Sequence, residues 1–160
     1  INLFTAVVAS TVIGLFDGSI EKVVALAILM PIVASMGGNA ATQTLTVTVR
    51  LLAAKELMAD NIFKIINKEC FVGFLNGLLF SVISAAFVYF WFYDFKLSIL
   101  IGISMIINMV FAGISGIIIP ISLYKYKIDP AVASTVFVTT VTDVIGFLSF
   151  LGLASFILGI

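Results

Sequence analysis

The chain has 160 residues, of which 62% are hydrophobic and 10% are charged, and its formal net charge is zero. Soluble domains are about 45–50% apolar and about 25% charged, so this composition predicts an integral membrane protein. The balanced charge gives no indication of a nucleic-acid partner, and the single cysteine, Cys70, excludes an intrachain disulfide. Because the sequence has no histidine, histidine-dependent catalytic triads are excluded, and since no other catalytic set is evident we do not expect an enzyme.

Five largely uncharged stretches predict the helices that cross the membrane, because a spanning helix needs about 20 mainly apolar residues. The stretches are 1–16, 23–49, 70–93, 97–124 and 130–160. The sequence therefore predicts an all-α integral membrane protein, with residues 1–160 forming a single transmembrane domain. Since the chain begins at Ile1, already inside an apolar run, we expect the first span to be truncated or short, with further sequence upstream.

The charged residues between the stretches predict the orientation of the chain. The second and fourth loops contain six basic residues, whereas the first and third contain two; these are Arg50, Lys55, Lys64, Lys68, Lys125 and Lys127 against Lys22 and Lys96. Basic loops stay in the cytoplasm, so we expect a cytoplasmic N-terminus and an external C-terminus. Of the four loops, only 50–69 is long enough to hold its own structure, and its charge pattern indicates a short amphipathic or interfacial segment.

Small residues spaced four apart predict close contacts between helices. The pairs are Gly14 and Gly18, Gly73 and Gly77, and Ala112 and Gly116. Such pairs are common in membrane bundles and identify no function. Asn76 and Asn108 lie inside the third and fourth spans, and we expect them to be structural hydrogen-bond partners rather than ligands.

The second predicted span carries a stripe of polar residues. Pro31 removes a backbone donor, and the Gly37–Gly38 pair lowers helix stability in mid-membrane, which is tolerated where the backbone lines a cavity or meets a partner. The stripe consists of Ser35, Gly38, Thr42 and Thr46, which share one helix face, with Asn39 and Gln43 flanking them. These side chains could line an ion path, or they could form hydrogen bonds between helices.

Asp143 is the most informative residue of the fifth span, because a carboxylate at the centre of a membrane helix costs roughly 3 kcal/mol. Thr135 and Thr139 lie on the same helix face at intervals of four residues. No lysine or arginine lies inside a predicted span, so the chain offers Asp143 no intramembrane salt bridge. The pattern predicts an ion or proton site, with a permanently protonated aspartate as the alternative.

Two segments together resemble the transmembrane domain of the MgtE family of bacterial magnesium channels. The first is Pro31-Ile-Val-Ala-Ser-Met-Gly-Gly-Asn-Ala-Ala-Thr-Gln, and the second is Asp129-Pro-Ala-Val-Ala-Ser followed by Thr-Thr-Val-Thr-Asp143. The second departs from the family at Val136, where proline is frequent. The resemblance implies a homodimer in the inner cell membrane, with a pore at the two-fold interface lined by the second and fifth helices.

The resemblance also implies roles for individual residues. Asp143 of both subunits is expected to bind Mg²⁺ at the centre of the pore, so Mg²⁺ is both the bound and the transported ion. The positions associated with the pore are Gly38, Asn39, Thr42, Thr46 and Thr139. Family members also carry cytosolic N and CBS regulatory domains, whose sequence is absent from these 160 residues.

The leading hypothesis from the sequence is therefore a Mg²⁺-selective channel pore for magnesium uptake, with a second copy of the chain, divalent cations and membrane lipid as partners. A Na⁺- or H⁺-coupled carrier, like the related solute carrier family 41 transporters, is a second hypothesis. A non-conducting membrane anchor is the third. Mg²⁺ gives up its water reluctantly, so a site for rapid passage should hold the hydrated ion through its waters.

Overall fold

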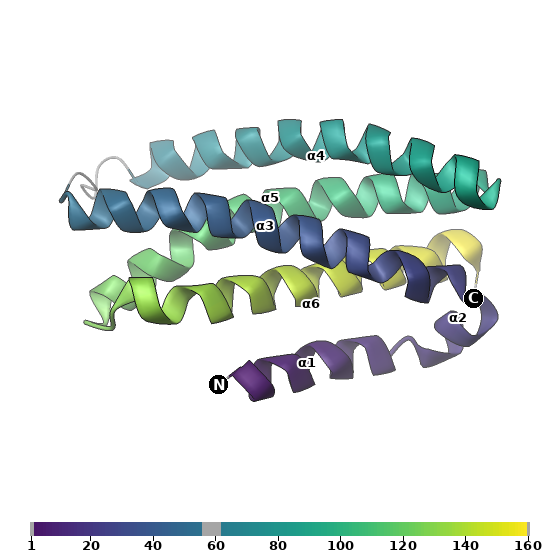
Figure 1. The fold of residues 1–160 in the computed structure, drawn as a ribbon, viewed down its shortest axis with the longest axis horizontal. Coiled ribbons are helices and arrows are strands. Elements are labelled where there is room, and N and C mark those ends of the chain that lie inside the picture. The colour runs from purple at the N-terminus through teal and green to yellow at the C-terminus, as the bar shows by residue number, and fades with distance from the viewer. Residues whose placement is uncertain (1, 56–61, 160) are drawn as a thin grey trace.

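A computed structural model describes residues 2–55 and 62–159, and the elements in these ranges are six helices (Figure 1). Four of them are long enough and apolar enough to cross a membrane, which agrees with the predicted all-α membrane protein. The helices are α1 (Asn2–Gly14), α2 (Asp17–Lys22), α3 (Ala25–Ala53), α4 (Ile62–Phe92), α5 (Phe95–Lys125) and α6 (Pro130–Leu158).

Local sequence explains where the last two helices begin. The Asp94 carboxylate accepts hydrogen bonds from the backbone N–H groups of Lys96 and Leu97 at 2.8 and 3.2 Å, and so caps α5. The Asp129 carboxylate accepts a bond from the N–H of Ala131 at 2.9 Å and caps α6, whose first residue is a proline. Asp129, which belongs to one of the two resembling segments, thus has a structural role at the helix start.

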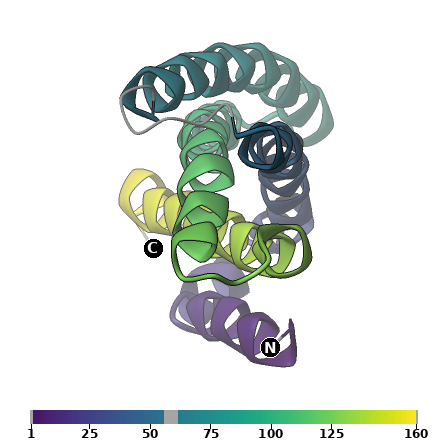
Figure 2. The ribbon, with the colours of Figure 1, turned by 90° about the vertical axis from the view of Figure 1, so that its left-hand side faces the viewer.

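The first predicted span is shorter than the other four. Helix α1 has 13 residues, which rise about 20 Å, whereas the apolar core of a bilayer is about 30 Å thick. It packs along α6 on the side of the bundle away from α4 (Figure 2). The four long helices cover the remaining predicted spans, although α3 ends four residues later and α4 begins eight residues earlier than predicted. A crossing by the segment that contains α1 stays a prediction.

The described residues differ from two expectations about the loops. The first loop folds into α2, because six residues with Asp17 in the first turn and Lys22 in the last complement the helix dipole. In the described part of the 50–69 interval there is no separate amphipathic segment, since α3 runs on to Ala53 and α4 already begins at Ile62. Charged residues ended the hydrophobic windows there, although lysine and glutamate are good helix formers. Residues 56–61 lie outside the described residues.

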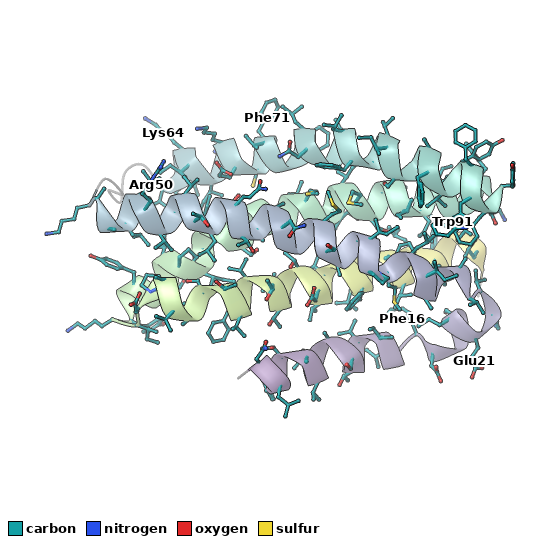
Figure 3. All side chains as sticks on the ribbon, viewed as in Figure 1. Phe16, Glu21, Arg50, Lys64, Phe71 and Trp91 are labelled. Carbon is teal, nitrogen blue, oxygen red and sulfur yellow. The ribbon has the colours of Figure 1, made fainter. Side chains whose placement is uncertain are left out.

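Helix α5 is the centre of the bundle. It packs against α4, α3 and α6 and is the most buried of the long helices (Figure 2). The last turn of α3, the first turn of α4 and the α5–α6 connection lie at the same end (Figure 1), which brings the predicted cytoplasmic basic residues together. Arg50 and Lys64 lie at this basic end, and Glu21 and Trp91 lie at the opposite end (Figure 3).

Glycines allow α4 and α5 to approach each other closely. A Cβ atom added to Gly73 would lie 2.7 Å from the Met109 carbonyl oxygen, and one added to Gly77 would lie 2.9 Å from the Ile106 Cα. The predicted close contact at this pair is therefore confirmed. The prediction for Gly14 and Gly18 was wrong within the described chain, because they fall in different helices and a Cβ at either would meet nothing within 4 Å.

A glycine in close contact with another helix, Gly73, and a glycine with open space around it, Gly14, together give a direct test of this packing. We expect Gly73→Ala to lower the free energy of unfolding by about 1–3 kcal/mol, because the added methyl group meets rigid backbone. Thermal unfolding in detergent measures the effect. The matched control is Gly14→Ala, which should not lower stability, and an equal loss in both variants would contradict the assignment.

Candidate functional site

The predicted polar helices, α3 and α6, pack side by side and run in opposite directions (Figure 1). They meet where Gly38 of α3 faces Thr142 of α6, since a Cβ at Gly38 would lie 3.9 Å from the threonine hydroxyl oxygen. Asn39 follows Gly38 and is the middle residue of α3, and Asp143 follows Thr142 and lies one residue from the middle of α6. The structure therefore brings these two predicted site residues to the same level, at half the length of both helices.

The polar stripe of α3 faces away from the core of its own chain. Ser35, Asn39 and Thr46 are exposed, and Gly38 and Thr42 are half-buried. The core-facing side of α3 is apolar or small except for the buried Thr48, and its other residues are Leu26, Leu29, Val33, Gly37, Ala41, Leu45 and Leu52. In a membrane helix, an exposed polar face of this kind requires water or a further polar surface opposite it.

The threonine hydroxyl groups of the stripe have their protons engaged in the helix. Thr42 donates to the Gly38 carbonyl and Thr46 donates to the Thr42 carbonyl, both at 2.8 Å. On α6, Thr139 donates to the Thr135 carbonyl at 2.9 Å. Each hydroxyl oxygen keeps its lone pairs as an acceptor. Acceptors are the groups that suit the outward-pointing protons of a hydrated cation.

Asp143 is half-buried, and its carboxylate forms no hydrogen bond or ion pair within the described residues. Thr142, the residue before it, is fully buried and donates to the Thr139 carbonyl at 2.9 Å, so α6 turns Thr142 inward and Asp143 outward. No group of three or more acidic, cysteine or histidine side chains that could hold a metal occurs within residues 2–55 and 62–159. One copy of the described chain thus offers a single unpaired carboxylate beside a row of neutral acceptors.

Asn108 of α5 contacts both α3 and α6 on their buried side, next to the level of Asn39 and Asp143. The sequence does not predict a site at this junction of three helices. The Asn108 side chain is fully buried, and its amide nitrogen donates to the Val33 carbonyl of α3 at 2.8 Å. The expectation that Asn108 is a structural hydrogen-bond partner is therefore confirmed. The amide occupies the space where side chains at Gly37 and Gly146 would lie. The sequence signal for this junction is an asparagine in an apolar span together with glycines in two other spans. Spacing alone does not show which glycines the asparagine contacts.

Glu69 is a second residue whose position in the structure the sequence does not predict. The charge pattern predicts a loop at Glu69, whereas the residue lies in the second turn of α4 and accepts a hydrogen bond from the Thr44 hydroxyl at 3.2 Å. A cavity of about 160 Å³ between α3, α4 and α5 is lined by both residues together with Gln43 and Asn76. Asn76 is exposed and forms no hydrogen bond within the described chain, so its expected pairing is not observed there.

Comparisons with known proteins agree with these observations. The MgtE family model, described as a divalent cation transporter, matches residues 30–153, which include α3 from Met30 onward and most of α6. The magnesium transporter MgtE of Bacillus subtilis is 34% identical over 153 residues, which are 96% of this chain and 34% of that protein.

Two further relatives have the same printed name. The magnesium transporter MgtE of Thermus thermophilus is 32% identical over 158 residues, 99% of this chain and 35% of that protein. The one of Enterococcus faecalis is 30% identical over 153 residues, 96% of this chain and 34% of that protein. The chain thus spans about a third of the length of these curated relatives.

The neighbouring glycines of α3 should respond to substitution in opposite ways. A methyl group at Gly37 would overlap the Asn108 amide, whereas one at Gly38 would make an ordinary contact with Thr142. We expect Gly37→Ala to lower the free energy of unfolding by about 1–3 kcal/mol and Gly38→Ala to leave it unchanged or slightly raised. Thermal unfolding in detergent distinguishes them. A larger loss in Gly38→Ala would show that the two faces of α3 are assigned wrongly.

Proposed function

The chain belongs to the MgtE family of divalent cation transporters, and from this premise we propose that it forms the membrane pore through which hydrated Mg²⁺ is taken up into the cell. The observation that carries the proposal is the unpaired carboxylate of Asp143 in the middle of α6, level with the polar face of α3. An intramembrane carboxylate without a cationic neighbour is a functional-site hypothesis by default.

The chemistry of the site fits a hydrated magnesium ion better than a dehydrated one. Mg²⁺ prefers octahedral coordination by oxygen and keeps its waters, so rapid passage is favoured by contacts made through those waters. Asp143 would supply negative charge, while Thr42, Thr46 and Thr139 would accept hydrogen bonds from the waters. The Asn39 amide oxygen and the backbone near Gly38 would add further acceptors at the same level. Selection would then depend on pore width and charge.

A second copy of the chain would complete the pore. Ser35, Asn39 and Thr46 of α3 are exposed on the single chain. On α6, Asp143 points away from the buried face. Two copies related by a two-fold axis would bring two such faces together and place the two Asp143 carboxylates opposite each other. We propose five crossings per subunit, with a cytoplasmic N-terminus and an external C-terminus in the inner membrane. The basic end at Arg50 and Lys64 supports that orientation.

Removing the carboxylate tests the proposed ion site. We expect Asp143→Ala to reduce Mg²⁺ uptake into liposomes about 100-fold, which corresponds to the roughly 3 kcal/mol typical of losing one partner of a buried charge interaction. Asp143→Glu should retain part of the uptake, because the charge remains but its position changes. Asp17→Ala removes an exposed acid of α2 and is the control. Retained selective uptake in Asp143→Ala would overturn the proposal.

Cross-linking tests the proposed dimer. In a Cys70→Ser background, Asn39→Cys places a thiol on the exposed polar face of α3, and we expect a short bifunctional thiol reagent to join two chains in membranes. Val82→Cys, on an exposed apolar face of α4, is the matched control and should remain monomeric under the same conditions. If both variants cross-link equally, or if neither does, the two-fold axis does not lie against the polar face of α3.

A further inference from the structure

Helices α3, α5 and α6 meet at one buried polar side chain, Asn108. It is completely inaccessible to solvent, and it lies against two positions that have no side chain of their own. A Cβ atom at Gly146 of α6 would lie 2.8 Å from the Asn108 amide nitrogen, and one at Gly37 of α3 would overlap the same amide. The asparagine therefore acts as a spacer that fills the gaps left by glycines on both neighbouring helices.

The hydrogen bonding of this side chain is unequal. The amide nitrogen donates to the Val33 carbonyl of α3, whereas the amide oxygen is buried and forms no hydrogen bond within the described chain. An unsatisfied buried acceptor is unfavourable, and a leucine, which has the same branching and number of side-chain heavy atoms, would carry no such acceptor. The observed contact is therefore the one through the donor, which joins Asn108 to the backbone of α3. A residue that only filled space would not need this contact.

The junction lies directly behind the proposed ion site. Gly37 precedes Gly38, which faces Thr142 at the level of Asn39 and Asp143. Gly146 follows Asp143 by three residues, which is roughly 4.5 Å along a helix axis. The spacer therefore acts on the same turns of α3 and α6 that carry the polar face, but from their buried side.

We propose that Asn108 is a positioning residue for the ion site: it sets the separation of α3 and α6 and the rotation of α3, and so determines how far Asp143 stands from the acceptors of α3. This inference rests on the proposed function. Asn108 does not touch the ion and acts through Val33, Gly37 and Gly146. Its loss lets α3 and α6 shift toward the space between the two glycines, which alters the width available to a hydrated ion.

The test compares variants of the full chain in liposomes by half-saturating Mg²⁺ concentration, maximal flux and the ratio of Mg²⁺ to Ca²⁺ flux. Asn108→Leu keeps the branching and the number of side-chain heavy atoms, is somewhat larger than asparagine, and removes the donor. We expect its half-saturating concentration to rise about threefold to tenfold, the effect of one lost hydrogen bond, and its Mg²⁺ preference to fall. Asn76→Leu is the matched control, since it makes the same exchange at an exposed asparagine of α4, and it should change neither quantity.

A second pair of variants carries the test if Asn108→Leu does not fold. Asn108→Ala opens the junction, and Asn108→Ala combined with Gly37→Ala puts a methyl group into part of the space that the amide occupied. We expect the double variant to unfold at a higher temperature than Gly37→Ala alone, because the overlap is relieved. Its Mg²⁺ to Ca²⁺ flux ratio should stay low, since the bond to Val33 is still missing.

The outcomes separate this inference from the proposed function. The wild-type chain and Asp143→Ala are prepared and measured in parallel. If Asp143→Ala takes up Mg²⁺ as well as the wild-type chain does, the proposed function itself is overturned. If uptake depends on Asp143 but Asn108→Leu, or the double variant, keeps the wild-type half-saturation and flux ratio, Asn108 is a packing residue only and the positioning role is wrong.

Discussion

A carboxylate in the middle of a membrane helix must be given a partner, and the rest of the structure depends on how this one is placed. The chain keeps Asp143 at mid-length of α6, half-buried and without a hydrogen bond or ion pair in the described residues. The roughly 3 kcal/mol cost of such a charge is offset when a cation or water meets it. The neutral acceptors of α3 at the same level favour a hydrated cation, in agreement with the membership of the chain in the MgtE family.

The two sides of α3 and α6 have different roles: the buried side packs against α5, and the opposite side carries the hydrogen-bond acceptors. On the buried side, Gly37 and Gly146 admit the Asn108 amide, and α5 is thereby fixed to both helices. On the other side, threonine hydroxyls keep their protons in the helix and leave oxygen lone pairs free. A site that selects ions by pore width and charge needs both features, a firmly packed buried side and an opposite side lined with acceptors. Asn108 connects the two, because it is fully buried behind the level at which the half-buried Asp143 lies.

Sequence patterns predicted the long helices and the polar faces well, because apolar length and helical spacing are set by local residues. They failed where helix boundaries or contacts between distant residues had to be predicted. Gly14 and Gly18 have the spacing of a close contact but belong to different helices, and Glu69 ended a hydrophobic window while remaining helical. Asn108 was expected to form a structural hydrogen bond, but its proximity to Gly37 of another helix is a tertiary fact that one sequence does not contain.

The central claim is that the partner of Asp143 is a hydrated divalent cation shared with a second copy of the chain. Anomalous diffraction from crystals of the chain soaked in Mn²⁺, an oxygen-binding ion that can replace Mg²⁺, tests it most directly. The account predicts one anomalous peak on a two-fold axis, between two Asp143 carboxylates and too far from them for direct coordination. A dimer without a peak there, or a peak held by groups of one chain only, would contradict it.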